Sequence, residues 1–98
     1  VTTVAPQALA LLNNSFSHDQ STALAGRIMS TTANHDEQVE LVWQFALGRK
    51  ATPHELSLGK THIDTQKFRF GDDKDSGRLA LSSLCHVLLN SNEFIYVD

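Results

Sequence analysis

The stretch that decides the fold is the C-terminal segment 79-LALSSLCHVLLNSNEFIYVD-98. Its first eleven positions hold six leucine or valine side chains, and one polar line recurs every four residues along the predicted helix, at Arg78, Ser82, His86 and Asn90. A helix that is apolar on its other sides is expected to lie at the centre of a helical domain. The apolar run then breaks, and Asn90 and Glu93 predict a capped last turn that folds the terminal aromatic residues back onto the bundle.

Upstream of this segment, the sequence predicts a short helix and then a longer one. Pro6 is tolerated in a first helical turn, and the leucines after it predict a helix over 6–12. Ser17 and Gln20 have the spacing of a capping box, which predicts a second helix from about residue 18 to residue 32. We expect Ala23, Leu24 and Ile28 on its inner side, and we expect Ala25 and Gly26 to allow close approach of a neighbour.

A third helix is predicted between two clear end signals. Asn34 or Asp36 can cap its start, and Gly48 is a natural terminator in the left-handed conformation. Most positions over 39–47 are apolar, which is typical of a helix covered on most sides. The C-terminal helix is therefore predicted to close the bundle against the face formed by 39–47.

The clearest local signal is Thr52-Pro53-His54-Glu55, with a Thr cap, Pro at the first helical position and Glu at the third. The helix that starts there is weakly patterned, and Gly59 inside it costs about 1 kcal/mol relative to Ala. We expect this fourth helix to be peripheral. An exposed loop is predicted over 68–77, with Ser76 as the cap of the final helix.

Length and composition further limit the possible fold class and function. A chain of 98 residues fits one domain, so residues 1–98 are interpreted as a single all-α domain, a compact bundle of about five helices. Eight Lys and Arg against eleven Asp and Glu give a formal charge of −3, which provides no footprint for nucleic acid. No apolar run is long enough to predict a membrane span. The chain starts at Val1 rather than Met, so we expect a fragment of a longer protein.

Metal sites are disfavoured by spacing. His54 and Glu55 do not belong to an H-E-x-x-H arrangement, because position 58 is Leu58, and the five histidines are better interpreted as solvated surface groups. The loop over 72–77 holds three aspartates, but aligning it with a calcium-binding loop puts Leu84 where a bidentate Glu is needed. We interpret it as a solvent-exposed acidic turn, with weak calcium binding by the loop as the alternative, and predict no metal site.

The cysteine and the aromatic residues are also considered for a functional role. Cys85 lies on an apolar helical face and is expected in the core, and the sequence has no C-x-x-C-H motif for haem attachment. No cofactor is therefore predicted within this segment. An aromatic surface, for instance for sugar, is an alternative to a core role for Trp43, Phe45, Phe94 and Tyr96.

Four segments together resemble a known family. They are TTVAPQALALLN at 2–13, LAGR at 24–27, LGRKATPHEL at 47–56 and LCHVLLNSNEFIYVD at 84–98. The chain resembles the C-terminal planctomycete-specific domain one, a domain of unknown function in large planctomycete proteins. The resemblance implies the C-terminal part of a longer, extracytoplasmic polypeptide, often with a cytochrome c module, so haem belongs to other modules. It assigns no catalytic residue. Gly59 and the polar run 62–67 depart from the apolar helix usual in the family, which leaves the extent of the fourth helix open.

Two hypotheses for function follow. The first is a non-catalytic helical module that docks against other domains of its own chain or against a protein partner, because no convergent catalytic set is visible. The second is a contribution to an extracytoplasmic enzyme or electron-transfer assembly, with polysaccharide as a candidate substrate. The polar residues that would carry a site are Arg49, His54, Glu55, Asn90, Asn92 and Glu93.

Overall fold

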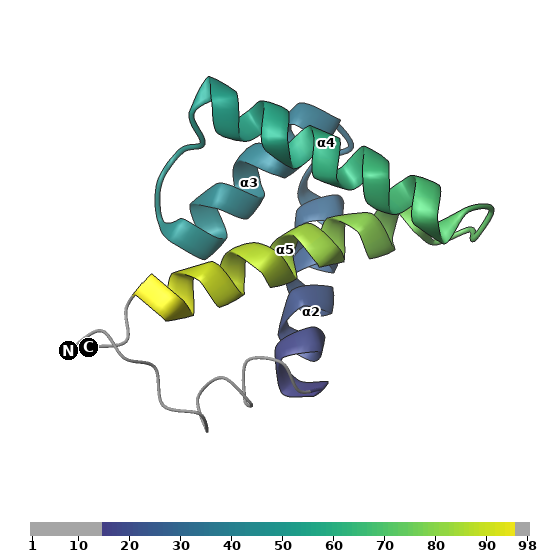
Figure 1. Cartoon of the computed structure of the whole chain (residues 1–98), viewed down its shortest axis with the longest axis horizontal. Helices are drawn as coiled ribbons and strands as arrows, with labels where there is room; N and C mark the ends of the chain where they lie inside the picture. The colour runs from purple at the N-terminus through teal and green to yellow at the C-terminus, as the bar shows by residue number, and fades with distance from the viewer. Residues whose placement is uncertain (1–14, 96–98) are drawn as a thin grey trace.

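The computed structural model describes the backbone of residues 15–95 and the side chains of residues 18–91. This part of the chain forms four helices and contains no strand: α2 (Ser15–Thr31), α3 (His35–Leu47), α4 (Pro53–Phe70) and α5 (Ser76–Ile95) (Figure 1). The all-α prediction is confirmed. The predicted number of about five helices is too high for the described range, and the short helix predicted over 6–12 lies outside it.

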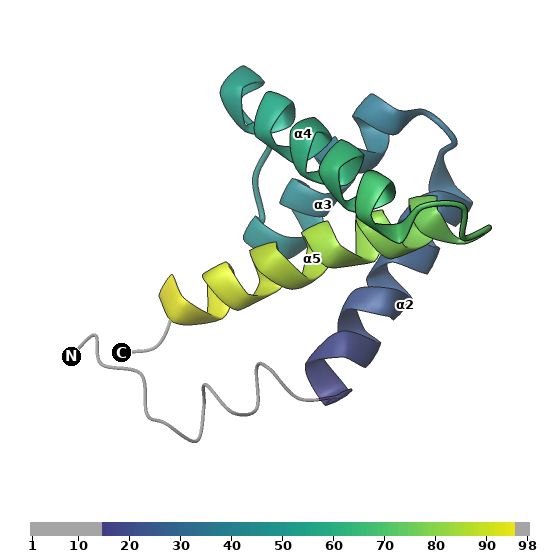
Figure 2. The same cartoon turned by 45° about the vertical axis from the view of Figure 1, so that its right-hand side comes forward.

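Helix α5 lies at the centre, as its apolar sides predicted. It contacts α2, α3 and α4, and Figures 1 and 2 show it running across the other three helices. Helices α2, α3 and α5 supply one shared core, whose buried members are Ala25, Ile28, Val39, Val42, Trp43, Leu81, Leu84 and Cys85. The C-terminal helix therefore closes against the 39–47 face, as predicted.

Helix α2 differs from its prediction at its start and on one face. It begins at Ser15, so Ser17 lies inside the helix rather than at a cap before it. Its end at Thr31 agrees with the predicted end to within one residue. Ile28 is fully buried, whereas Ala23 is exposed rather than inward. Ala25 is fully buried in the core, but Gly26 has no neighbour within 4 Å of a virtual Cβ, so the expected close approach is wrong at Gly26.

Helix α3 has the predicted ends. Asn34 is its cap, and the Asn34 Oδ1 accepts a hydrogen bond of 3.0 Å from the Glu37 N–H. Gly48 ends the helix with φ of 71°, the left-handed conformation that glycine adopts without steric penalty. The helix is less covered than predicted, because Phe45 is 48% exposed beneath the Arg27 guanidinium, 5.2 Å from its ring centre.

Helix α4 is longer than predicted and packs closely against α3 at one glycine. Its capping box is present as expected, but the helix continues to Phe70, so the loop starts at Gly71 rather than at Phe68. Gly59 is buried, and a Cβ placed there would lie 2.7 Å from Val39 Cγ1 and 2.9 Å from Trp43 Cζ3. The missing side chain lets α4 approach α3 closely at this point. The peripheral placement is confirmed, because Gly59 is the one buried residue of α4 and the helix supplies no buried member of the core.

The α4–α5 connection is an acidic turn that bonds to itself. Asp73 Oδ1 accepts a hydrogen bond of 2.8 Å from the Asp75 N–H, and Asp75 pairs with Arg78 at 3.0 Å. The Leu79 N–H donates to the Asp75 carbonyl at 2.8 Å. Because the cap residue is the one whose carbonyl accepts the first helical bond, Asp75 caps α5, and the prediction of Ser76 was wrong by one position.

Helix α5 does not break where the sequence predicted. It continues through Asn90 to Ile95, so Asn90 and Glu93 are inside the helix and do not start a separate last turn. Its polar line faces α2: the Ser82 and Thr22 hydroxyls are 3.4 Å apart, and the His18 and His86 rings stack with centres 4.4 Å apart. Of the described helices, none has the length and apolar character needed to cross a membrane.

Candidate functional site

Two of the six candidate residues meet at the junction between α3 and α4. Arg49 follows the left-handed Gly48, and this turn directs its side chain toward the first turn of α4. There the guanidinium binds Glu55 through two parallel hydrogen bonds, each of 2.7 Å: Nη1 to Oε1 and Nη2 to Oε2. A forked pair of this kind fixes orientation as well as distance. The junction is therefore held by a pair six residues apart in sequence.

The backbone of the junction is held by two glutamates. The Thr52 N–H donates a hydrogen bond of 2.9 Å to Glu55 Oε1, and the Glu55 N–H donates one of 3.2 Å to Thr52 Oγ1. Together these two bonds form a reciprocal capping box. On the other side of the turn, the Ala51 N–H donates a hydrogen bond of 3.0 Å to Glu40 Oε1. The polar groups of the junction thus bind the chain's own backbone.

Electrostatics at the junction favour a permanently charged pair. The hydrogen bonds from Arg49, and then the one from the Thr52 N–H, hold the pKa of Glu55 well below its usual range. The Trp43 indole N–H also contributes to this lowering, although it does not reach full hydrogen-bond geometry. The bond to Glu55 raises the pKa of Arg49 in turn. A carboxylate held this way does not exchange protons near neutral pH, which makes Glu55 a poor general acid or base.

The structure describes the side chains of two of the other four candidates, His54 and Asn90. His54 is exposed in the first turn of α4, next to the pair in sequence. Asn90 is half-buried on α5 and has a partner of its own. The side chains of Asn92 and Glu93 lie outside the described residues. Trp43, considered for an aromatic surface, is only 5% exposed and belongs to the core.

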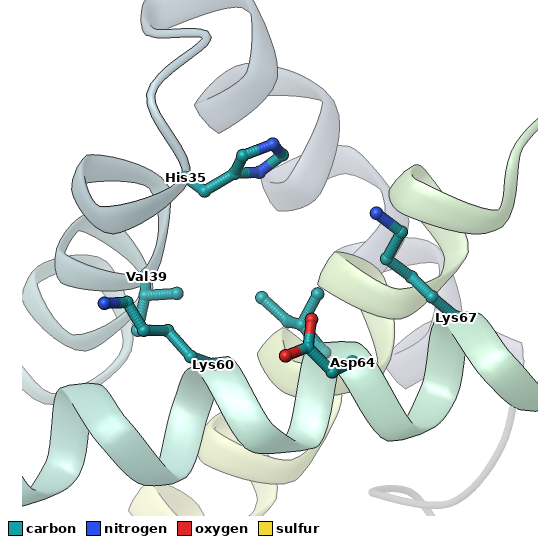
Figure 3. Close-up of a pocket in the computed structure, with 6 residues that line it drawn as sticks. His35, Val39, Lys60, Asp64 and Lys67 are labelled. Carbon is teal, nitrogen blue, oxygen red and sulfur yellow. The ribbon is translucent and has the colours of Figure 1, made fainter.

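A cavity of about 230 Å³ lies between the start of α3 and the middle of α4 (Figure 3). It is lined by His35, Val39, Lys60, Ile63, Asp64 and Lys67. In Figure 3 His35 and Lys67 stand on opposite sides of the opening, and Asp64 lies between Lys60 and Lys67 along α4. Lys60 binds Asp36 at 2.8 Å. Within the described residues, neither Lys67 nor Asp64 has an ion-pair partner.

This cavity was not predicted from the sequence. Residues 62–67 were interpreted only as a polar run, but Lys60 and Asp64 are four residues apart, as are Ile63 and Lys67, so the four side chains share one helix face. That spacing was the available signal. What the sequence could not supply was the opposing wall, which comes from His35 and Val39 of α3.

The remaining reactive side chains, Cys85 and His62, lie in contacts between helices. Cys85 is fully buried, and burial raises the pKa of its thiol to about 12, which confirms the core prediction. His62 Nε2 lies 3.0 Å from Ser83 Oγ across the α4–α5 contact, and burial lowers the pKa of this imidazole. In the part of the chain that the structure describes, no three His, Cys, Asp or Glu side chains gather as a metal-binding group.

Comparison with known proteins identifies the family. A family model described as a protein of unknown function, DUF1553 (PSD1), matches residues 1–63. This range includes the junction motif 47–56 and its two upstream companions, and it ends before the C-terminal motif 84–98. No curated protein and no solved structure matches the chain at a significant level. The chain therefore belongs to the planctomycete-associated PSD1 family of unknown function, the family that its motifs resembled.

Proposed function

We propose that this chain is a non-catalytic helical module that docks against another part of a larger extracytoplasmic protein or against a protein partner. The observation that carries the proposal is that the polar side chains of the motif 47–56 make their hydrogen bonds within the fold. Arg49, Thr52 and Glu55 bond to one another and to backbone, so they are not directed at a ligand. The motif then serves to hold α3 and α4 at a fixed angle.

The exposed surface supports the same proposal. Six large apolar side chains of the described residues are exposed, at Met29, Phe45, Leu58, Phe68, Phe70 and Val87. Phe68 is the extreme case, with 87% of its surface exposed near the end of α4. Single exposed apolar residues are ordinary on a protein surface, but a Phe this exposed is a suitable anchor for a partner, because buried aromatic side chains dominate interface energies.

The test is cross-linking of the longer protein that contains this module. An amine-reactive cross-linker is applied, and peptides from Lys60, Lys67 and Lys74 are analysed by mass spectrometry. The proposal predicts cross-links from the module to other domains or to a co-purifying protein. Cross-links confined to the module would contradict it.

The enzyme reading is tested in parallel. Arg49→Met, Asn92→Ala and Glu93→Gln would be introduced into the longer protein, and any activity it has would be measured. The docking proposal predicts unchanged turnover in variants that remain folded. A loss of turnover in a folded variant would instead support a contribution to an enzyme or electron-transfer assembly.

A further inference from the structure

The α3–α4 cavity has features of a small binding site that the fold does not require. Its apolar floor consists of Val39, which is 1% exposed, and the half-buried Ile63. Its rim carries two lysines, one aspartate and one histidine. With a volume of about 230 Å³ it lies below the roughly 300–1,000 Å³ typical of small-molecule pockets. A site of this size suits one side chain rather than a whole ligand.

The rim offers hydrogen-bond donors to an anion. The lining residues Lys60 and Lys67 each carry a positive charge, and Asp64 carries one negative charge. Lys60 is held by Asp36 outside the cavity. Of the two lining lysines, Lys67 is the one without an ion pair among the described residues, and Figure 3 shows its ammonium facing His35 across the opening.

We propose that this cavity receives one glutamate or aspartate side chain of the segment that docks against the module. Its methylene groups lie on Val39 and Ile63, and its carboxylate binds the Lys67 ammonium and the His35 imidazole N–H. This inference rests on the proposed docking function and names the chemistry of the docked segment. The negative charge of Asp64 limits the affinity, because it repels the incoming carboxylate.

The test uses two probes that differ only in charge: N-acetyl-glutamate amide and N-acetyl-glutamine amide. Each is titrated into the ¹⁵N-labelled 98-residue chain while backbone amide shifts are followed by NMR. We expect saturable shifts at residues 35, 39, 60, 63, 64 and 67 with the glutamate probe, weakened by added salt, and at least fivefold weaker binding of the glutamine probe. Equal binding of both probes, or no saturable shift at these residues, would overturn the assignment.

Three variants test whether the cavity binds an anion or a cation. Lys67→Gln is expected to weaken binding of the glutamate probe at least threefold, and Asp64→Asn is expected to strengthen it about threefold. Lys74→Gln, in the α4–α5 turn and outside the lining, is expected to leave binding unchanged. Opposite shifts for Lys67→Gln and Asp64→Asn would show a site for a cation and overturn the proposal. All three substituted side chains are exposed, so the fold is expected to persist, as a well-dispersed spectrum would verify.

The outcome is separable from that of the docking test. Cross-links to other domains together with a failed titration would leave the docking function standing and remove the cavity as its anchor. A successful titration without any such cross-link would keep the carboxylate site and remove the docking function.

Discussion

Gly59 of α4 lies directly against Trp43 of α3, so closely that a methyl group on Gly59 would come within 2.9 Å of the indole Cζ3. Val39 Cγ1 would be closer still, at 2.7 Å, and both neighbours are buried core side chains with little room to move. The contact between the two helices therefore depends on the absence of a side chain at position 59.

Gly59→Ala is predicted to destabilise the fold. Overpacking a core costs about 1–3 kcal/mol, whereas Ala in a helix gains about 1 kcal/mol over Gly. Because the clash involves two buried groups, we expect a net loss of about 1–2 kcal/mol in unfolding free energy, measured by urea titration.

Gly26→Ala is the matched control, with the opposite sign. Gly26 lies in the middle of α2, and a Cβ there meets nothing within 4 Å. Only the helix propensity changes, so we expect a gain of up to about 1 kcal/mol. A gain at position 59 as large as that at position 26 would show that the helices are not in tight contact.

Thr52→Ala is predicted to remove the side-chain half of the α4 capping box. The Glu55 N–H loses its 3.2 Å acceptor, and loss of such a cap costs about 1 kcal/mol, within a range of about 0.5–2. Thr61→Ala is the control, because Thr61 is exposed inside the same helix, where Ala has the higher propensity. Equal stability changes for the two variants in thermal unfolding would contradict the capping role.

His62 is predicted to make the fold sensitive to mild acid. Burial lowers the pKa of His62 in the folded state, while in the unfolded chain it is near 6.5. The unfolded state therefore binds more protons as the pH falls through about 6.5, so the stability is full above that value and declines below it toward the folded pKa.

His62→Gln keeps a polar partner for Ser83 and removes the titration. Unfolding free energies measured from pH 7.5 to pH 5 should then show a flatter dependence on pH than those of the unmodified chain. His54→Gln, an exposed histidine of the same helix, serves as control and should leave the slope unchanged. An identical slope for His62→Gln and the unmodified chain would refute this origin of the acid sensitivity.

Cys85 is predicted to be unreactive in the folded protein. With the pKa of the thiol raised to about 12, roughly one thiol in ten thousand is ionised at pH 8, and the thiolate is the reactive species. Ellman's reagent should therefore label the native chain at least a hundredfold more slowly than the chain in urea. Fast labelling of the native chain would mean that the core around the middle of α5 opens readily.

Much of the fold could be predicted from local signals in the sequence. The Asn34 cap, the left-handed Gly48 and the box at Thr52 and Glu55 each depend on a few neighbouring residues, and all three are present. The central position of α5 followed from its apolar sides. These features depend on propensity and short-range bonding, which the sequence encodes directly.

The features that the sequence did not reveal depend on contacts between distant segments. Gly59 looked like a weak point of α4 until its contact with Trp43 was seen. Asn90 looked like a break, but helix α5 continues past it. The cavity needs two helices to form, and the forked pair of Arg49 and Glu55 needs the turn between them. None of these partners can be identified from local sequence alone.

A double-mutant cycle on Arg49 and Glu55 tests most directly whether these two residues serve the fold. Glu55→Gln keeps the capping-box residue type, and Arg49→Met keeps the aliphatic stem and removes the donors. Unfolding free energies would be measured for the unmodified chain, the two single variants and the double variant. The account predicts that the double variant loses less stability than the sum of the single losses, since each single variant already breaks the pair. Strictly additive losses would contradict it, because the two residues would then not support the junction through each other.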